Sequence, residues 1–141
     1  MKAIGVNTFI NKRFDTFAFD DAWKDSFGEP EKNFKMIVYG SSGNGKTEFS
    51  VKFAKYLATF GKVAYCSYEQ GISKSLQDAI VRNNMEKVSG KVMFLSGGSL
   101  PDLIEYIRKS GSKIVIIDSL DYMKLTTEQF KVLIKTFKKK A

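Results

Sequence analysis

Eight consecutive residues combine the side-chain types that hold a phosphate chain, and they match the pattern G-x-x-x-x-G-K-[ST] at every fixed position. In this pattern, backbone N–H groups of a glycine-rich loop converge on phosphate oxygens, and the N-terminus of the next helix adds partial positive charge. Lys46 can reach the β- and γ-phosphates as a binding and catalytic group, and the Thr47 hydroxyl can bind Mg²⁺. The predicted binding residues are Gly40, Ser41, Ser42, Gly43, Asn44, Gly45, Lys46 and Thr47.

Two acidic residues follow apolar, β-prone runs further along the chain. Asp118 comes directly after Ile114-Val115-Ile116-Ile117, which is the Walker B pattern, and Glu69 ends another such run. Ligands of open α/β sheets bind at the C-terminal ends of strands, so we expect Asp118 to lie near Thr47 and hold Mg²⁺. A carboxylate at Glu69 can take the proton of a water that attacks the γ-phosphate. Asp121 is a weaker candidate for that role, and the alternatives are a helix-capping Asp118 and a solvated Glu69.

A sheet and helices are needed to position these residues, and the hydrophobic pattern of the sequence predicts both. Nearly continuous apolar runs alternate with amphipathic stretches, which predicts a parallel sheet covered on both faces. The expected class is α/β, a three-layer αβα sandwich with about four core strands. We expect residues 1–33 to form an N-terminal extension that packs on a nucleotide-binding domain of residues 34–141. The expected strands are 34–39, 62–68, 91–95 and 113–118, and the expected helices follow Thr47, Ser73, Ser99 and Thr126.

Composition excludes several kinds of chemistry. The 141 residues suffice for one domain with a real core, and they include no histidine and one cysteine. Histidine-dependent triads are therefore excluded, and a structural zinc site is not expected. Cys66 lies inside an apolar run and is predicted to fill the core. The printed sequence has neither a long apolar run nor a signal-peptide pattern, which favours a cytoplasmic protein without a membrane span.

The net charge of +8 is unevenly distributed. Residues 124–141 carry six basic side chains and one acidic side chain, and they include Lys138-Lys139-Lys140. A basic segment of this kind can attract nucleic acid. The alternative is a solvated helix end, where lysines complement the helix dipole.

The order of the motifs resembles the RecA-like branch of P-loop ATPases, which includes the RecA/RadA recombinases and the DnaB-type helicase motors. The matching stretches are Gly40 to Thr47, Tyr65-Cys66-Ser67-Tyr68-Glu69 and Ile114-Val115-Ile116-Ile117-Asp118-Ser119, within roughly residues 34–137. The resemblance implies a RecA-like P-loop fold, ATP and Mg²⁺ as ligands, and Glu69 as the catalytic base. It also implies a DNA transaction, such as recombination, replication or repair, with single-stranded DNA as a partner. In overall form the chain is similar to small stand-alone RecA-like ATP-binding proteins of bacteriophages.

One part of that family has no counterpart in the printed sequence. RecA-like proteins continue past the Walker B strand and its helix into a fifth strand that carries a polar sensor residue. Here Ala141 follows the last predicted helix directly, and the family's DNA-binding loops and arginine finger are also missing. We therefore expect a shortened fold of this type. The resemblance supports a nucleotide site more strongly than efficient hydrolysis or motor activity.

Three functions compete on these grounds. The first is an ATPase, and the second is a nucleotide-binding module without efficient hydrolysis. A small-molecule kinase ranks third, because Arg13, Arg82 and Arg108 are too dispersed to form an arginine-rich lid. A GTPase is not expected, because the base-reading Asn-Lys-x-Asp pattern is absent.

The missing fifth strand predicts that residues 34–39 form an exposed edge of the sheet. An apolar edge strand invites pairing with another segment. Either residues 14–19 or a second copy of the protein can cover it. We expect self-association or aggregation rather than N-terminal coverage, because no clear turn leads residues 14–19 back.

Overall fold

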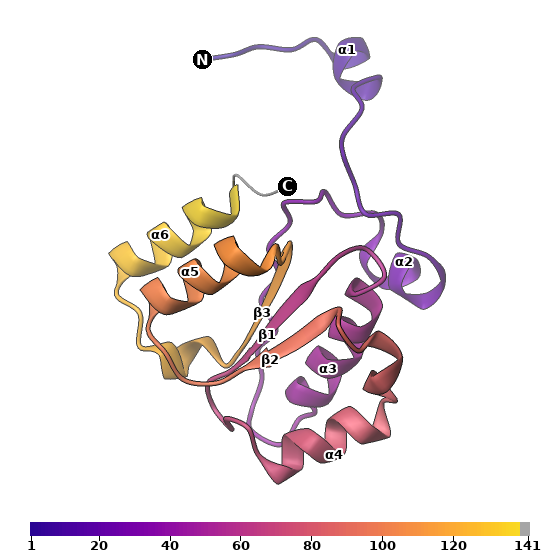
Figure 1. Cartoon of the computed structure of the whole chain (residues 1–141). Coiled ribbons are helices and arrows are strands. Elements are labelled where there is room, and N and C mark those ends of the chain that lie inside the picture. Colours follow the sequence, from indigo (N-terminus) through magenta and orange to yellow (C-terminus); the bar gives the residue numbers. More distant parts are fainter. Residues whose placement is uncertain (139–141) are drawn as a thin grey trace. The chain divides into compact units, whose positions relative to one another are not determined.

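The computed structural model describes residues 1–138 and divides into two compact units, Met1–Met36 and Ile37–Ala141 (Figure 1). This boundary lies close to the one expected between residues 33 and 34. The packing of an N-terminal extension on the core stays a prediction. Among the described residues, no helix combines the length and the apolar character that crossing a bilayer requires.

The N-terminal unit contains a chain reversal that the sequence did not reveal. Its helices are α1 (Val6–Ile10) and α2 (Asp21–Phe27). After α2 the chain turns back, and the Phe17 N–H donates to the carbonyl of Pro30 at 2.9 Å. The expectation that no turn returns this segment was therefore wrong, because a short helix followed by a bend reverses the chain.

Three phenylalanine rings gather at this reversal. Phe17 and Phe19 are buried, and their ring centroids lie 5.9 and 6.4 Å from that of Phe34. Edge-to-face rings at such separations stabilise each other beyond the area that they bury. The N-terminal aromatics thus cover Phe34, the first residue of the expected strand 34–39.

The second unit is built on a small parallel sheet. Its strands are β1 (Val63–Ser67), β2 (Val92–Leu95) and β3 (Ile114–Asp118), in the order β2-β1-β3. Val63 pairs with Val92 on one side and with Ile114 on the other. The α/β class and the parallel sheet are thereby confirmed. The register also sets Ser67 beside Asp118, so β1 and β3 end at the same edge.

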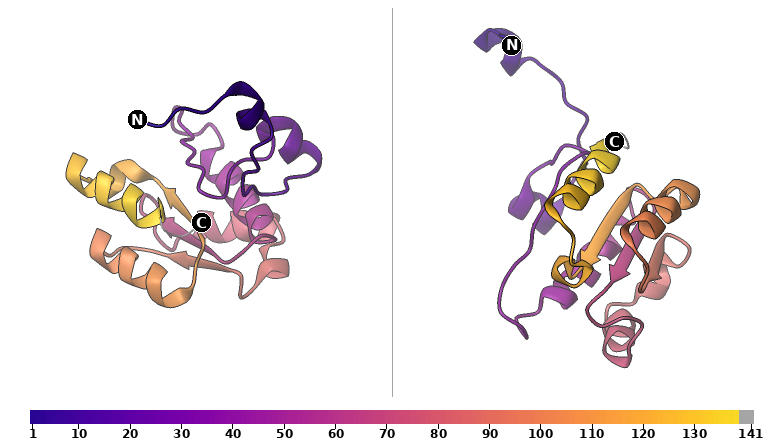
Figure 2. Two further views of the ribbon diagram at one scale, coloured as in Figure 1. Left: turned by 90° about the horizontal axis from the view of Figure 1, so that it is seen from above. Right: turned by 90° about the vertical axis from the view of Figure 1, so that its left-hand side faces the viewer.

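Four helices flank this sheet. Figure 1 shows α3 and α4 on one side and α5 and α6 on the other, and Figure 2 shows α5 and α6 running side by side. The described part of the unit also contains two 3₁₀ turns, η1 (Met85–Val88) after α4 and η2 (Leu120–Met123) after β3. The helices are α3 (Lys46–Leu57), α4 (Lys74–Arg82), α5 (Leu100–Ser110) and α6 (Thr127–Lys138).

Side-chain caps start three of these helices at the predicted residues. The Ser73 hydroxyl accepts from the Leu76 N–H, which satisfies a donor that the first turn of α4 leaves unpaired. Ser99 and Asp102 form a reciprocal capping box at α5. Thr126 and Gln129 do the same at α6, with hydrogen bonds of 2.9 and 3.2 Å.

The core lies between the sheet and its helices. On the α5–α6 side, the buried side chains of Cys66, Leu103, Ile107 and Leu133 form one cluster. Burial raises the pKa of the Cys66 thiol to about 12, so the thiol stays protonated at neutral pH. The prediction that Cys66 fills the core is confirmed.

The prediction of a strand over residues 34–39 was wrong for the described structure, and the sheet has three strands rather than about four. Ile37 and Tyr39 are 77% and 90% exposed, and the order β2-β1-β3 leaves β2 and β3 as the two edge strands of the described sheet. An apolar, β-prone run favours a strand only where a neighbouring strand completes its hydrogen bonds. Self-association of the chain stays a prediction.

Candidate functional site

The glycine-rich loop lies exposed directly before α3. Gly43 and Gly45 have φ angles of 80° and 76°, in the left-handed region where a residue with a Cβ atom is strained. Gly45 is the N-cap of α3, so it turns the chain sharply into the helix. The loop thereby leads straight to the helix N-terminus, where unpaired N–H groups favour an anion.

The Lys46 side chain folds back over this loop. Its ammonium donates to the carbonyl oxygens of Gly40 and Ser41, both at 2.8 Å. An ammonium has three N–H donors, so one remains for another acceptor. The loop's own carbonyl oxygens therefore hold the positively charged ammonium of Lys46 against the loop.

Thr47 and Asp118 lie 71 positions apart along the chain and meet in the structure, as the sequence predicted. The Thr47 hydroxyl donates to Oδ2 of Asp118 at 2.9 Å. Asp118 is the last residue of β3 and is only 7% exposed. The structure thus brings a hydroxyl from the start of α3 to a buried carboxylate at the edge of the sheet.

Tyr65 is a third member of this group, and sequence reasoning missed it. Its hydroxyl donates to the same Asp118 oxygen at 2.8 Å. Burial, together with the hydrogen bond to Asp118, raises the pKa of Tyr65, so the phenol keeps its proton. Only the pairing of β1 with β3 reveals this contact, because Tyr65 resembles any other apolar strand residue in the sequence.

Glu69 lies at the same edge of the sheet, two residues beyond the end of β1. Its backbone N–H donates to the Asp118 carbonyl at 3.2 Å. The side chain is exposed, and among residues 1–138 its carboxylate makes no hydrogen bond or ion pair. The backbone of Glu69 therefore lies next to that of Asp118, as predicted. Among the described residues, no partner fixes the orientation of the Glu69 carboxylate.

Asp121 lies in η2, after β3, and is exposed. It lines a hollow of about 320 Å³ together with Lys124 and Phe130. In the described part of the chain, no hydrogen bond or ion pair joins its carboxylate to Thr47 or Asp118. Of the two candidate bases, Glu69 is thus the one whose backbone N–H donates a hydrogen bond to Asp118.

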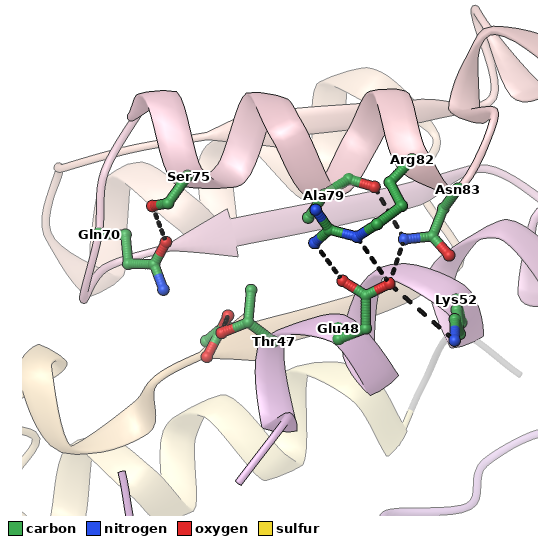
Figure 3. A network of polar contacts seen from close by, with 9 residues as sticks. Thr47, Glu48, Lys52, Gln70, Ser75, Ala79, Arg82 and Asn83 are labelled. Atoms are coloured by element: carbon green, nitrogen blue, oxygen red, sulfur yellow. Dashed lines mark hydrogen bonds and ion pairs between the residues drawn. The ribbon is translucent and has the colours of Figure 1, made fainter. Parts of the chain in front are cut away.

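A second polar group, shown in Figure 3, joins α3 to α4. Glu48, the residue after Thr47, accepts from Arg82 Nη2 at 2.7 Å and from Asn83 Nδ2 at 2.9 Å. These two hydrogen bonds, that from Arg82 first, lower the pKa of Glu48. Arg82 is exposed and Glu48 is half-buried, so we expect this pair to orient α4 more than to stabilise the fold.

The opposite end of α4 is tied to the segment that carries Glu69. The Ser75 hydroxyl donates to Gln70 Oε1 at 2.8 Å, as Figure 3 also shows. Helix α4 therefore contacts a neighbour of Thr47 at one end and a neighbour of Glu69 at the other. Sequence reasoning missed these contacts. The only signal in the sequence was that a polar residue follows each predicted site residue, Glu48 after Thr47 and Gln70 after Glu69.

The basic end of the chain lies partly outside the described residues. Lys139 and Lys140 lie outside the described residues, as does the side chain of Lys138. Within the described part of α6, the Lys131 ammonium lies 3.1 Å from the Glu128 carboxylate. That pair is typical of a solvated helix face.

Comparison of this sequence with protein-family models and with curated proteins finds no match.

Proposed function

We propose that this chain is a RecA-like P-loop ATPase that binds ATP·Mg²⁺ and couples binding and hydrolysis to a DNA transaction. The observation that carries the proposal is the 2.9 Å hydrogen bond from Thr47 to Asp118. This contact sets the end of the G-x-x-x-x-G-K-[ST] loop against the carboxylate that ends β3, and it supports a triphosphate–metal site. The order β2-β1-β3 is compatible with a P-loop type of α/β fold, which we propose as the finer architecture.

The oxygen atoms at this point fit Mg²⁺. This ion usually takes one or two protein oxygens together with phosphate oxygens and waters. The Thr47 hydroxyl and the Asp118 carboxylate supply such a set and already converge. We assign Thr47 as a ligand and Asp118 as the group that holds the surrounding shell. Mg²⁺ held by these residues would offset the negative charge of the β- and γ-phosphates.

The loop supplies the remaining phosphate contacts. The N–H groups of residues 43–47 lie at the N-terminus of α3, where the helix dipole favours a phosphate. The carbonyls of Gly40 and Ser41 now hold the Lys46 ammonium, and phosphate oxygens are stronger acceptors for a cation. We therefore infer that Lys46 turns from these carbonyls to the β- and γ-phosphates when a nucleotide binds.

Glu69 is the proposed general base for hydrolysis. Its backbone lies beside Asp118, and its carboxylate has no competing partner among the described residues. It can accept the proton of a water that attacks the γ-phosphorus.

A nucleotide-binding module without efficient turnover is the second candidate. It is favoured by the same exposed Glu69 side chain, because a general base needs a fixed position relative to the proton that it removes. The two candidates share the ATP·Mg²⁺ site and differ only in the chemical step.

One assay separates the candidates. Binding of each nucleoside triphosphate is measured first, and phosphate release is then followed with and without single-stranded DNA. The proposal predicts preferential ATP binding and DNA-stimulated phosphate release. Binding without release favours the module, and absence of nucleotide binding would remove both functions.

Nucleic-acid binding has its own test at the basic end of the chain. If residues 124–141 contact single-stranded DNA, affinity falls steeply as salt rises, because each phosphate contact releases a condensed counterion. Replacing Lys138, Lys139 and Lys140 together by Gln should flatten that salt dependence. A Lys109→Gln variant is a control for the loss of a paired surface charge. An unchanged salt titration in the triple variant would identify the run as a solvated helix end.

A further inference from the structure

Tyr65 is buried at the centre of the sheet, yet its polar end reaches the candidate site. The residue is 0% exposed, and its ring centroid lies 5.0 Å from that of Phe94 on the neighbouring strand. A hydroxyl buried at this depth is costly unless it is hydrogen-bonded. Here the hydroxyl donates to Asp118 at 2.8 Å. Strand packing therefore holds both the ring and the donor in place.

The Asp118 carboxylate is bound unevenly by its neighbours. Oδ2 accepts two hydrogen bonds, one from Tyr65 and one from Thr47. No hydrogen bond to Oδ1 is present in the described residues. Two donors on a single oxygen restrict the rotation of the carboxylate and leave the second oxygen available. This arrangement suits a carboxylate that must offer one oxygen to waters around a cation.

We propose that Tyr65 is a positioning residue for the ATP·Mg²⁺ site, because its hydroxyl holds the Asp118 carboxylate in the orientation that the metal shell needs. This inference rests on the proposed function. It assigns to the Tyr65 hydroxyl a role that ring packing alone does not require, since phenylalanine would fill the same space. Thr47 cannot supply this role alone, because its oxygen is itself the proposed ligand.

The test is the Tyr65→Phe variant, which removes one oxygen atom and keeps the ring. ATP affinity is measured by calorimetry, once with Mg²⁺ and once with EDTA. Hydrogen bonds to a charged group are among the stronger ones, so we expect about tenfold weaker ATP binding with Mg²⁺. We expect no change with EDTA, because Tyr65 acts only through the group that holds the metal shell.

Two companion variants make the comparison specific. Tyr106→Phe removes a hydroxyl of α5 that makes no hydrogen bond to Asp118 among the described residues, and it should change neither affinity. Asp118→Asn should remove most of the Mg²⁺ effect, and adding Tyr65→Phe to it should then have little further consequence. Such non-additivity is expected when one residue acts through the other.

The outcomes separate this inference from the proposed function. Equal affinities of wild type and Tyr65→Phe with Mg²⁺ would overturn the role of Tyr65, as would an equal loss with and without the metal. A wild-type chain that binds ATP no better with Mg²⁺ than with EDTA would contradict the proposed site itself, and Tyr65 with it.

A second measurement does not depend on the stability of the variant. 3-Fluorotyrosine is placed at position 65 only, and its ¹⁹F resonance is followed in the otherwise unchanged protein. We expect a shift when Mg²⁺ is added to the ATP-bound protein, and a smaller one when ATP is added without metal. A resonance that does not respond to Mg²⁺ would contradict the proposal.

Discussion

A Glu69→Gln variant is expected to bind ATP·Mg²⁺ like the wild type while its rate of phosphate release falls by about 10²–10⁴-fold. The reason is chemical: the amide keeps the size of the side chain but cannot accept the proton of the attacking water. Glu69 is exposed and unpaired among the described residues, so the change should leave the fold intact. Single-turnover phosphate release and a separate binding titration measure the two effects.

Two control variants show whether a loss of turnover is specific to Glu69. Glu105→Gln changes a surface carboxylate on α5 that pairs with Lys109, and it should leave turnover unchanged. Asp121→Asn tests the weaker candidate base. Wild-type turnover in Glu69→Gln with a loss in Asp121→Asn would move the catalytic role to Asp121. Wild-type turnover in both variants would show that neither Glu69 nor Asp121 acts as a general base.

A Lys46→Ala variant is expected to bind ATP about tenfold or more weakly. A hydrogen bond between an ammonium and a phosphate contributes about 1.5–3 kcal/mol, and each 1.4 kcal/mol corresponds to about a factor of ten. Among the described residues, the Lys46 ammonium bonds to two loop carbonyls and to no other group, and alanine is a good helix former. We therefore expect a small change in the unfolding midpoint and a large change in affinity.

Lys52→Ala is the matched control for this variant. It removes the same charge from the same helix, and its ammonium lies 4.0 Å from Glu48 rather than at the loop. Its ATP affinity should stay close to that of the wild type. If Lys46→Ala and Lys52→Ala bind ATP equally well, the assignment of the phosphate loop is wrong.

Local patterns predicted much of the fold and the neighbourhood of Thr47 and Asp118. The capping pair Ser99–Asp102 marked the start of α5, because its signal lies within four residues. The apolar run before Asp118 became β3, since such a run can be buried on both faces of a parallel sheet. Strand order then brought the carboxyl ends of β1 and β3 together, as the rule for open α/β sheets predicts.

What the sequence did not reveal depends on partners distant along the chain. The segment 34–39 has strand propensity, but propensity does not supply a neighbouring strand, and the described structure has none there. The contact of Tyr65 with Asp118 needs the register of β1 against β3. The pairing of Glu48 with Arg82 needs the approach of α3 to α4. None of these relations leaves a periodic signal in the sequence.

The central claim is that residues 40–47 bind the phosphates of ATP, and backbone amide NMR tests it most directly. ATP·Mg²⁺ is titrated into ¹⁵N-labelled protein, and adenosine without phosphates is the control ligand. We expect saturable shifts of the amides of Gly43, Gly45, Lys46 and Thr47 with ATP·Mg²⁺, and none with adenosine. Unmoved amides in this loop at saturating nucleotide, or shifts confined to other parts of the chain, would contradict the account.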